Sequence, residues 1–278
     1  MHRLLIAAAA AALIPVASWG QLTAAADGPI AMGHHHFNVS DRAAHDRFWI
    51  DLLGGEPAKI GSRDIIKYPN ALFFFREKEP TGGSRGTSVN HIGFQVPDVD
   101  GLVAKLKAAG IEIATQQEVS GGRATGDVFH SPSQDVDLAF VIGPDNMKVE
   151  LMENEALDRP IVNHHIHFAG PVEEMQQWYL DKFGGKARKR GMFESIDLPG
   201  VNLTFAGADE FTGTKGRVLD HIGFEVDGLE ALCKRLEADG VSFDVPFREV
   251  PALGITIAFL TDPWGTYIEL TEGLDKVK

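Results

Sequence analysis

The sequence predicts an α+β fold of four βαβββ modules, paired into two cupped mixed-sheet domains with helices outside. Three observations lead to this prediction. A histidine-centred segment occurs four times, each copy is followed by a helical pattern that stops at glycine, and extended segments follow each helix. One such module cannot cover both faces of its sheet, whereas two can wrap into a cup. The concave inner surface of the cup is where ligand sites usually lie.

Each module is expected to open with a strand that carries histidine. The four openings share the pattern His, two residues, Phe, and they are Gly33-His34-His35-His36-Phe37, Asn90-His91-Ile92-Gly93-Phe94, His164-His165-Ile166-His167-Phe168 and Asp220-His221-Ile222-Gly223-Phe224. The copies also repeat in pairs, because 131 residues separate His34 from His165 and 130 separate His91 from His221. This near-equality indicates an old duplication of a two-module domain.

A helix is expected after each opening strand. Apolar residues recur with helical spacing and glycine follows as a stop signal. The apolar stripes are Phe48, Trp49, Leu52 and Leu53; Val99, Leu102, Val103 and Leu106; Met175, Trp178, Tyr179 and Phe183; and Leu229, Leu232, Cys233 and Leu236. Ser40 is the expected N-cap of the first helix. The single cysteine, Cys233, rules out an intrachain disulfide and is expected to be a buried thiol.

Extended segments complete each module, for example residues 71–75, 136–141, 201–205 and 255–260. The polar stretch from Asn154 to Pro160 has the character of a linker. We therefore expect two domains, residues 31–154 and 161–273, each built from two consecutive modules.

The N-terminus resembles a secretory signal peptide over residues 1–26. A basic start is followed by an apolar run from Leu4 to Val16 and by small residues near positions 18–20 and 24–26. The apolar run is short for a membrane span, which needs about 20 residues. We expect cleavage after Gly20 or Ala26 and a periplasmic or secreted location. An uncleaved membrane anchor is the alternative.

The formal net charge of −13 limits the classes of partner. Nucleic acid and anionic membrane surfaces would both be repelled. We expect a small-molecule substrate, no nucleic acid and no membrane partner after signal cleavage, while the oligomeric state stays open.

Two matching segments place a glutamate in an apolar strand. The segment from Gly143 to Leu151 matches that from Asp262 to Leu270, and each has a proline turn followed by a strand with Glu150 or Glu269. An ionised carboxylate in an apolar strand needs a partner, which a metal ion held by histidines would supply. The predicted ligand sets are His34, His91 and Glu150 in the first domain, and His165, His221 and Glu269 in the second. Two histidines and one carboxylate form the facial triad typical of Fe(II), with Mn(II) or Zn(II) as alternatives.

These motifs resemble the vicinal oxygen chelate superfamily, of the glyoxalase, bleomycin resistance and extradiol dioxygenase type, in its tandem two-domain form. The opening signature is His34, Asp41 and Gly54-Gly55, and the closing signature is Asp262-Pro263-x-Gly265 leading to Glu269. The resemblance implies a metal-dependent enzyme that acts on a small molecule with adjacent oxygen atoms.

Ligand number narrows the reaction that the resemblance implies. Glyoxalase I and the methylmalonyl-CoA epimerases of this superfamily take a fourth ligand, Glu or Gln, from the last strand of a module, but residues 70–75 and 201–205 contain neither. A three-ligand, dioxygenase-like centre is therefore favoured. Extradiol enzymes also carry a tyrosine where this chain has Phe140 and Phe259, and a histidine that residues 191–205 lack. Ordinary catechol cleavage is thus disfavoured, and the alternatives are a glyoxalase-like lyase or isomerase and a non-catalytic small-molecule binding protein.

Other histidines are assigned by strand alternation. His36 and His167 share a face with the proposed ligands and are candidate catalytic acid–base groups, orienting groups or pocket walls. His35 and His164 face the opposite side and are expected to be structural. His130 is a loop histidine that could close over a site, and Arg123 is either an anion-binding residue or an exposed loop arginine.

Overall fold

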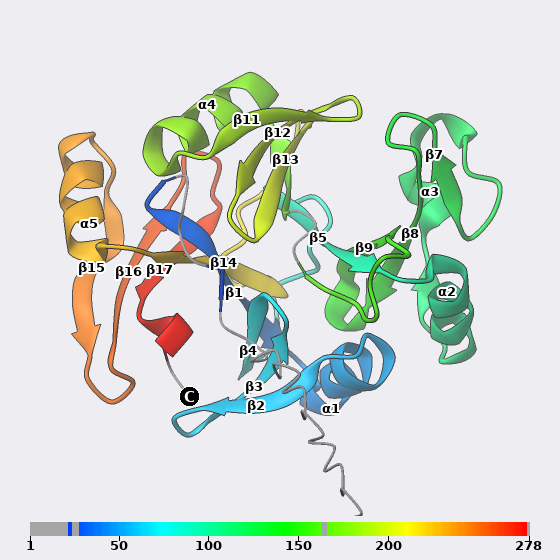
Figure 1. Cartoon of the computed structure of the whole chain (residues 1–278), viewed down its shortest axis with the longest axis horizontal. Coiled ribbons are helices and arrows are strands. Elements are labelled where there is room, and N and C mark those ends of the chain that lie inside the picture. The colour runs from blue at the N-terminus through cyan, green and yellow to red at the C-terminus, as the bar shows by residue number, and fades with distance from the viewer. Residues whose placement is uncertain (1–21, 24–27, 163–165, 277–278) are drawn as a thin grey trace, which may run out of the picture.

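Two mixed sheets form the body of the protein (Figure 1), whose computed structural model describes residues 22–23, 28–162 and 166–276. The first sheet has eight strands in the order β15 (Phe243–Val250), β16 (Ile255–Thr261), β17 (Tyr267–Glu272), β14 (Leu219–Val226), β1 (Ile30–Val39), β4 (Ala71–Glu77), β3 (Arg63–Tyr68) and β2 (Glu56–Ile60). The second has nine strands. Eight run in the order β11 (Lys186–Arg190), β12 (Phe193–Leu198), β13 (Val201–Gly207), β10 (Ile166–Gly170), β5 (Val89–Val96), β9 (Met147–Glu153), β8 (Val136–Gly143) and β6 (Glu112–Ile113), and β7 (Phe129–Ser131) pairs with β8.

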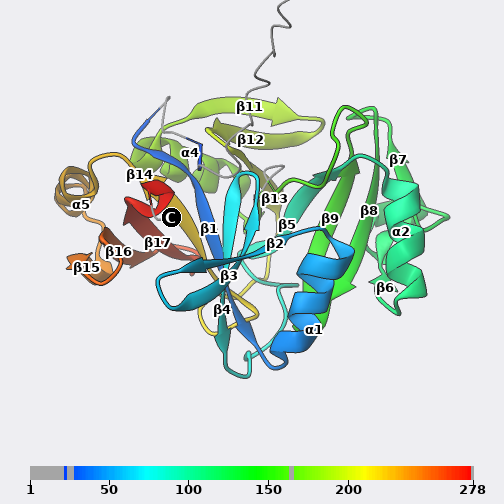
Figure 2. The same ribbon diagram turned by 60° about the horizontal axis from the view of Figure 1, so that its bottom comes forward.

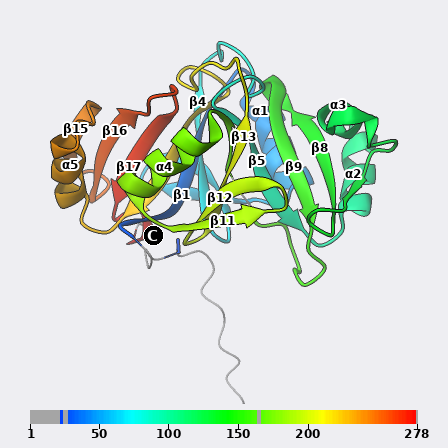
Figure 3. The same cartoon turned by 90° about the horizontal axis from the view of Figure 1, so that it is seen from above.

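The helices lie around the outside of the two sheets in Figure 1, and Figures 2 and 3 show the same elements from other sides, which confirms the predicted α+β class. They are α1 (Arg42–Asp46, continued by a π-helical segment Arg47–Leu52), α2 (Val99–Ala108), α3 (Thr115–Glu118), α4 (Val172–Phe183) and α5 (Leu229–Ala238). The N-cap of α1 is Asp41, whose carboxylate accepts hydrogen bonds from the backbone N–H groups of Ala43 and Ala44. Ser40 instead donates to Asp145, so the expectation of Ser40 as the cap is wrong.

The first and second modules do not share a sheet, nor do the third and fourth, so the prediction of domains at residues 31–154 and 161–273 is also wrong. The first module pairs with the fourth through antiparallel β1 and β14, and the second pairs with the third through antiparallel β5 and β10. All four opening strands carry the same pattern, so the repeat itself does not specify which two pair. Both sheets therefore contain strands from either side of the expected boundary near Pro160.

The first and second modules, and likewise the third and fourth, meet instead through their apolar faces. The ring centroid of Phe94, on β5, lies 6.1 Å from that of Trp49 and 5.1 Å from that of Tyr68. Phe183 of α4 and Phe224 of β14 pack in the same way in the other half of the chain, 5.8 Å apart. One hydrophobic core consequently runs through all four modules.

Strand alternation separates this core from the concave faces. On β14, Ile222 and Phe224 are fully buried in the core, while His221 projects from the opposite face. The same alternation on β5 directs Phe94 inward to the core and His91 to the concave side. Cys233 packs in the core on α5, as expected, and burial raises the pKa of its thiol to about 11.

The predicted signal peptide lies outside the described residues, apart from Leu22 and Thr23. Leu22 is buried in a small apolar cluster with Ile60 and Leu274. Within the described ranges, every helix is too short or too polar to cross a membrane.

Candidate metal centre

Three predicted ligands converge at the centre of the eight-stranded sheet. His34 comes from β1, His221 from β14 and Glu269 from β17, and their ligand atoms all lie within 4.8 Å of one another. The Nε2 atoms of His34 and His221 lie 2.9 Å and 3.0 Å from the same Glu269 oxygen. The centre thus joins the first and fourth modules.

These separations fit a first-row divalent ion. Adjacent ligands that each lie about 2.1 Å from an octahedral ion are about 3.0 Å apart, which follows from the usual metal–ligand distances. Burial raises the pKa of Glu269, but the two histidines outweigh it and hold the pKa below its ordinary value. The carboxylate is therefore ionised at neutral pH, as a metal ligand must be.

Backbone geometry explains why His34 can reach this point. β14 and β17 run parallel with Gly223 opposite Glu269, and β1 brings His34 opposite Gly223 on the other side. A Cβ atom at position 223 would lie 2.1 Å from Cε1 of His34. Gly223 therefore leaves the space that the imidazole occupies.

Asp220 fixes the orientation of His221. One Asp220 oxygen lies 2.8 Å from Nδ1 of His221, and the other accepts hydrogen bonds from Asn38 and from the backbone N–H of Gly216. Burial lowers the pKa of His221, but its bonds to Asp220 and Glu269 outweigh burial and the net pKa is raised. A carboxylate on Nδ1 is the usual arrangement that directs Nε2 of a histidine at a metal ion.

A cavity of about 120 Å³ opens in front of these side chains. His34, His36 and Glu269 line it on the sheet side, and Phe74, Ile255 and Ile257 form apolar walls. Arg63 and Arg248 also line it, and neither forms an ion pair with any residue in the part of the chain that is described. The cavity therefore combines ligand atoms, apolar walls and two cationic groups.

His36 lies inside this cavity, as its strand position predicts. Its ring centroid is 4.5 Å from that of His221, and its buried Nε2 atom has no hydrogen-bond partner among the described residues. Burial and the neighbouring histidines lower the pKa of His36 to about 2. The imidazole is therefore neutral at ordinary pH.

The position of a fourth ligand is apolar. β4 pairs in parallel with β1, so that Leu72 lies opposite His34 and Phe74 opposite His36. Phe259 packs edge-on against His221 with ring centroids 5.3 Å apart. The centre thus offers three protein ligands, as the absence of Glu or Gln in residues 70–75, which include most of β4, predicts.

The expected grouping of the six ligands changes with the pairing of the modules. In the nine-stranded sheet, Nε2 of His91 lies 3.2 Å from a Glu150 oxygen, in the counterpart of the His221–Glu269 arrangement. His34 is not part of that group, because β1 belongs to the other sheet. His165 and His164 lie outside the described residues. The backbone of His167 pairs with that of His91.

Three further residues singled out from the sequence lie outside the metal centre. His35 is fully buried against Phe37 and Phe73, on the face opposite His34. His130 is exposed on β7, where it pairs with Asp137, and it lines neither cavity described here. Arg123 lines a second cavity, in front of Glu150.

Asp220, Arg63 and Arg248 are candidate functional residues that the motif analysis missed. Asp220 precedes His221 directly, and a comparison of the residues before the four histidines would have drawn attention to it. The two arginines share no motif and lie far apart in the chain, on β3 and β15, and only the fold brings them to one cavity.

Comparison with known proteins places this geometry in a family. The model of the Glyoxalase/Bleomycin resistance protein/Dioxygenase superfamily matches residues 117–270, more than half of the chain. Glyoxalase I from Zea mays has a similar structure, with 15% sequence identity, a TM-score of 0.68 and coverage of 90% of this chain and 94% of that chain.

A "putative dioxygenase" from Bacillus subtilis subsp. subtilis str. 168 is similar as well, with 11% identity, a TM-score of 0.62 and coverage of 89% and 86%. At these identities the likeness concerns the fold, and no curated protein matches the sequence significantly. The family match, together with the fold, leads to one conclusion: the chain belongs to the Glyoxalase/Bleomycin resistance protein/Dioxygenase superfamily.

Proposed function

We propose that this protein is a metal-dependent enzyme that acts on a small molecule with two adjacent oxygen atoms. The observation that carries the proposal is the convergence of His34, His221 and Glu269 around one point with separations near 3 Å. A divalent ion, with Fe(II) favoured and Mn(II) or Zn(II) as alternatives, would supply Lewis-acid chemistry and open coordination positions there.

The residues around the centre have separate tasks in this proposal. Asp220 holds His221 in the tautomer that presents Nε2 to the cavity. His36 is the catalytic candidate, because its neutral imidazole has an unsatisfied Nε2 atom beside the ligands and can form a hydrogen bond with a substrate hydroxyl or carbonyl. His167, its sequence counterpart and the second catalytic candidate, takes no part in this centre, because β10 belongs to the nine-stranded sheet.

The cavity also favours a particular kind of substrate. Arg63 and Arg248 line the cavity, and in a protein with a net charge of −13 two arginines without an ion-pair partner among the described residues favour an anionic group. Phe74 and Ile257 provide apolar contact between the two regions. We therefore propose a substrate with a chelating pair of oxygens at one end and a negative charge at the other.

A dioxygenase-like reaction is the leading assignment, since three protein ligands leave positions for both substrate and O₂. A glyoxalase-like lyase or isomerase is the second candidate, favoured by Phe259, which packs on His221 at the sequence position where extradiol enzymes carry a tyrosine that handles substrate protons. A non-catalytic binding protein is the third. It predicts ligand affinity that survives Glu269→Gln, and oxygen uptake separates the first two, since a lyase turns over its substrate anaerobically.

Metal analysis tests the proposal directly. Untagged protein is reconstituted anaerobically with Fe(II), Mn(II) or Zn(II), and bound metal is measured by mass spectrometry after desalting. We expect stoichiometric binding in the wild type and loss of that binding in Glu269→Gln and His221→Ala. Glu249→Gln, an exposed glutamate on β15, is the matched control. A wild-type protein without affinity for any of the three ions would refute the proposed function.

A further inference from the structure

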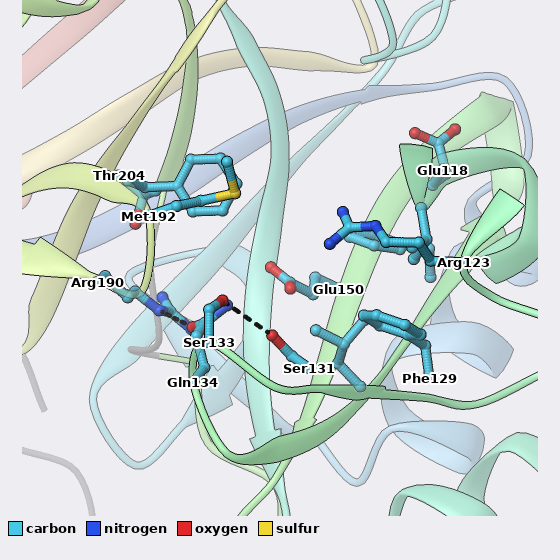
Figure 4. A pocket seen from close by; sticks show the side chains of 14 residues that line it. Glu118, Arg123, Phe129, Ser131, Ser133, Gln134, Glu150, Arg190, Met192 and Thr204 are labelled. Atoms are coloured by element: carbon cyan, nitrogen blue, oxygen red, sulfur yellow. Dashed lines mark hydrogen bonds between the residues drawn. The ribbon is translucent and has the colours of Figure 1, made fainter. Parts of the chain in front are cut away.

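A second cavity of about 140 Å³ lies at the equivalent place of the nine-stranded sheet (Figure 4), in front of Glu150 and Phe140. Glu150 and Phe140 are the counterparts of Glu269 and Phe259, since each glutamate lies opposite its phenylalanine in the closing strand pair. The two cavities therefore descend from the same position of the repeated module, and their differences can be compared residue by residue.

The immediate surroundings of the histidine differ first. Where His221 has the carboxylate of Asp220 on Nδ1, His91 has the amide oxygen of Asn90 at 3.1 Å. That amide oxygen also accepts a hydrogen bond of 2.8 Å from the ammonium group of Lys148. One negative charge of the first centre is thus absent from the second.

The second cavity has positively charged side chains at positions where the metal centre has uncharged ones. Lys148 is buried and occupies the position of Tyr267, two residues before the glutamate on the same strand face. Arg190, on β11, occupies the position of the apolar Ile60 on β2 and lines the cavity with Glu150. Glu150 raises the pKa of Arg190, although burial is the larger effect and the net pKa is lowered to about 10. Glu150 therefore already lies in the field of two cations.

This arrangement does not fit a divalent ion. An ion at the carboxylate would be repelled by the guanidinium and the ammonium, and that repulsion is strong because little water screens charges in a buried site. Glu118 offsets part of the charge of Lys148, at 2.5 Å, but it is shared with Arg85 at 2.8 Å and does not compensate Arg190. This poor fit to a divalent ion concerns only the nine-stranded sheet, which carries His91. It does not affect the centre at Glu269.

The remaining walls indicate what the cavity can bind. Phe129, Leu138, Phe140 and Phe193 provide apolar and aromatic surface. Met192, at the rim, is 71% exposed and is the one large apolar side chain so exposed in the part of the chain that the structure describes. Arg123 and Arg190 extend into the cavity from opposite sides (Figure 4). Arg123 and Arg190 line the cavity with Glu118 and Glu150, and Lys148, which bonds Glu118 behind the wall, adds a third positive charge to this set.

We propose that the cavity in front of Glu150 is a metal-free binding site for a small aromatic carboxylate, distinct from the metal centre at His34, His221 and Glu269. Arg123 supplies the accessible cation for the carboxylate, and the phenylalanines contact the ring. Lys148 and Arg190 take the place of the metal ion as counter-charges of Glu150. This inference does not depend on the proposed enzymatic function, because it concerns a different cavity.

The number of metal ions bound per chain tests the first part of the proposal, that the cavity in front of Glu150 is metal-free. Wild-type protein should bind one ion per chain, Glu269→Gln should bind none, and Glu150→Gln should still bind one. Two ions per chain, or loss of the ion in Glu150→Gln, would overturn the inference. A wild type that binds no ion would overturn the proposed function. The proposal for the second cavity would then be decided by the calorimetry with benzoate.

Calorimetry tests the second part of the proposal, that the cavity binds a small aromatic carboxylate. Benzoate is the charged probe and benzyl alcohol the uncharged one. In protein treated with a chelator, benzoate should bind at one site per chain and benzyl alcohol at least tenfold more weakly. Arg123→Gln should weaken benzoate binding about tenfold, equivalent to about 1.4 kcal/mol. Arg123 is exposed, so its replacement should not impair folding, which circular dichroism checks. Arg47→Gln, at an exposed position that lines neither cavity, is the matched control, and Arg63→Gln reports whether benzoate binds in the metal cavity instead. An absence of benzoate binding, or binding that depends on Arg63 rather than Arg123, would overturn the proposal.

Discussion

At the scale of single residues, Gly223 determines whether the metal centre can form. The imidazole of His34 lies where a side chain at position 223 would begin. We expect Gly223→Ala to displace His34, to abolish stoichiometric metal binding and to lower the free energy of unfolding by about 1–3 kcal/mol, as overpacking usually does. Gly207→Ala is the control, since a Cβ atom there meets nothing within 4 Å. Metal analysis and denaturant unfolding measure the two effects, and full metal binding by Gly223→Ala would contradict this account.

Asp220 acts on the same centre through His221. Asp220→Asn keeps the size of the side chain but removes the charge that stabilises Nδ1–H of His221, and it reproduces the pairing that Asn90 has with His91. We expect metal affinity to fall by roughly 10–100-fold, the usual effect of losing such a partner. A competition titration with a chromophoric chelator measures this change. Asp158→Asn, at an exposed ion pair with Arg159, should leave the affinity unchanged, and equal affinities in the two variants would show that Asp220 has no orienting role.

At the scale of elements, a buried carboxylate joins β14 to the end of β17. Glu225 accepts hydrogen bonds from the hydroxyl of Thr271 and the backbone N–H of Gly273, next to Leu274, which lines the metal cavity. Burial, together with Asp275, raises the pKa of Glu225 to about 7. The folded protein therefore binds a proton that the unfolded chain, with its ordinary pKa, releases at lower pH.

The sign of the resulting pH dependence follows from proton linkage. The contribution of Glu225 is fully present below the unfolded pKa and is lost as the pH rises through the folded pKa near 7. Glu225→Gln should therefore gain thermal stability relative to the wild type between about pH 5 and about pH 8. Melting temperatures across this range measure the difference. Glu249→Gln should show a constant offset, and a constant offset in Glu225→Gln as well would rule out this titration.

At the scale of the whole molecule, the sequence predicted the modules and most of the ligand residues but not their pairing. Periodic patterns are local, so the helices at Trp49 and Leu232 and the strand alternation at His221 followed from spacing alone. The choice of partner depends on contacts between distant segments, such as Phe94 on Trp49, which no local pattern encodes. For the same reason His34 was grouped with His91 instead of His221, and Arg63 and Arg248 were not recognised as neighbours.

Pairing of the first module with the fourth predicts how the protein behaves when its chain is cut. A protease site inserted at exposed positions near Glu155 and Asp158 would break the chain between the halves expected from sequence. In both sheets, strands from before the cut pair with strands from after it, namely β1 with β14 and β5 with β10. We therefore expect the cleaved halves to elute together in size-exclusion chromatography, to separate only in denaturant and to keep the bound metal. Intact protein with the same insertion is the control. Separation into two folded halves under native conditions would mean that the first module pairs with the second and the third with the fourth after all, because only then could each half retain a complete sheet.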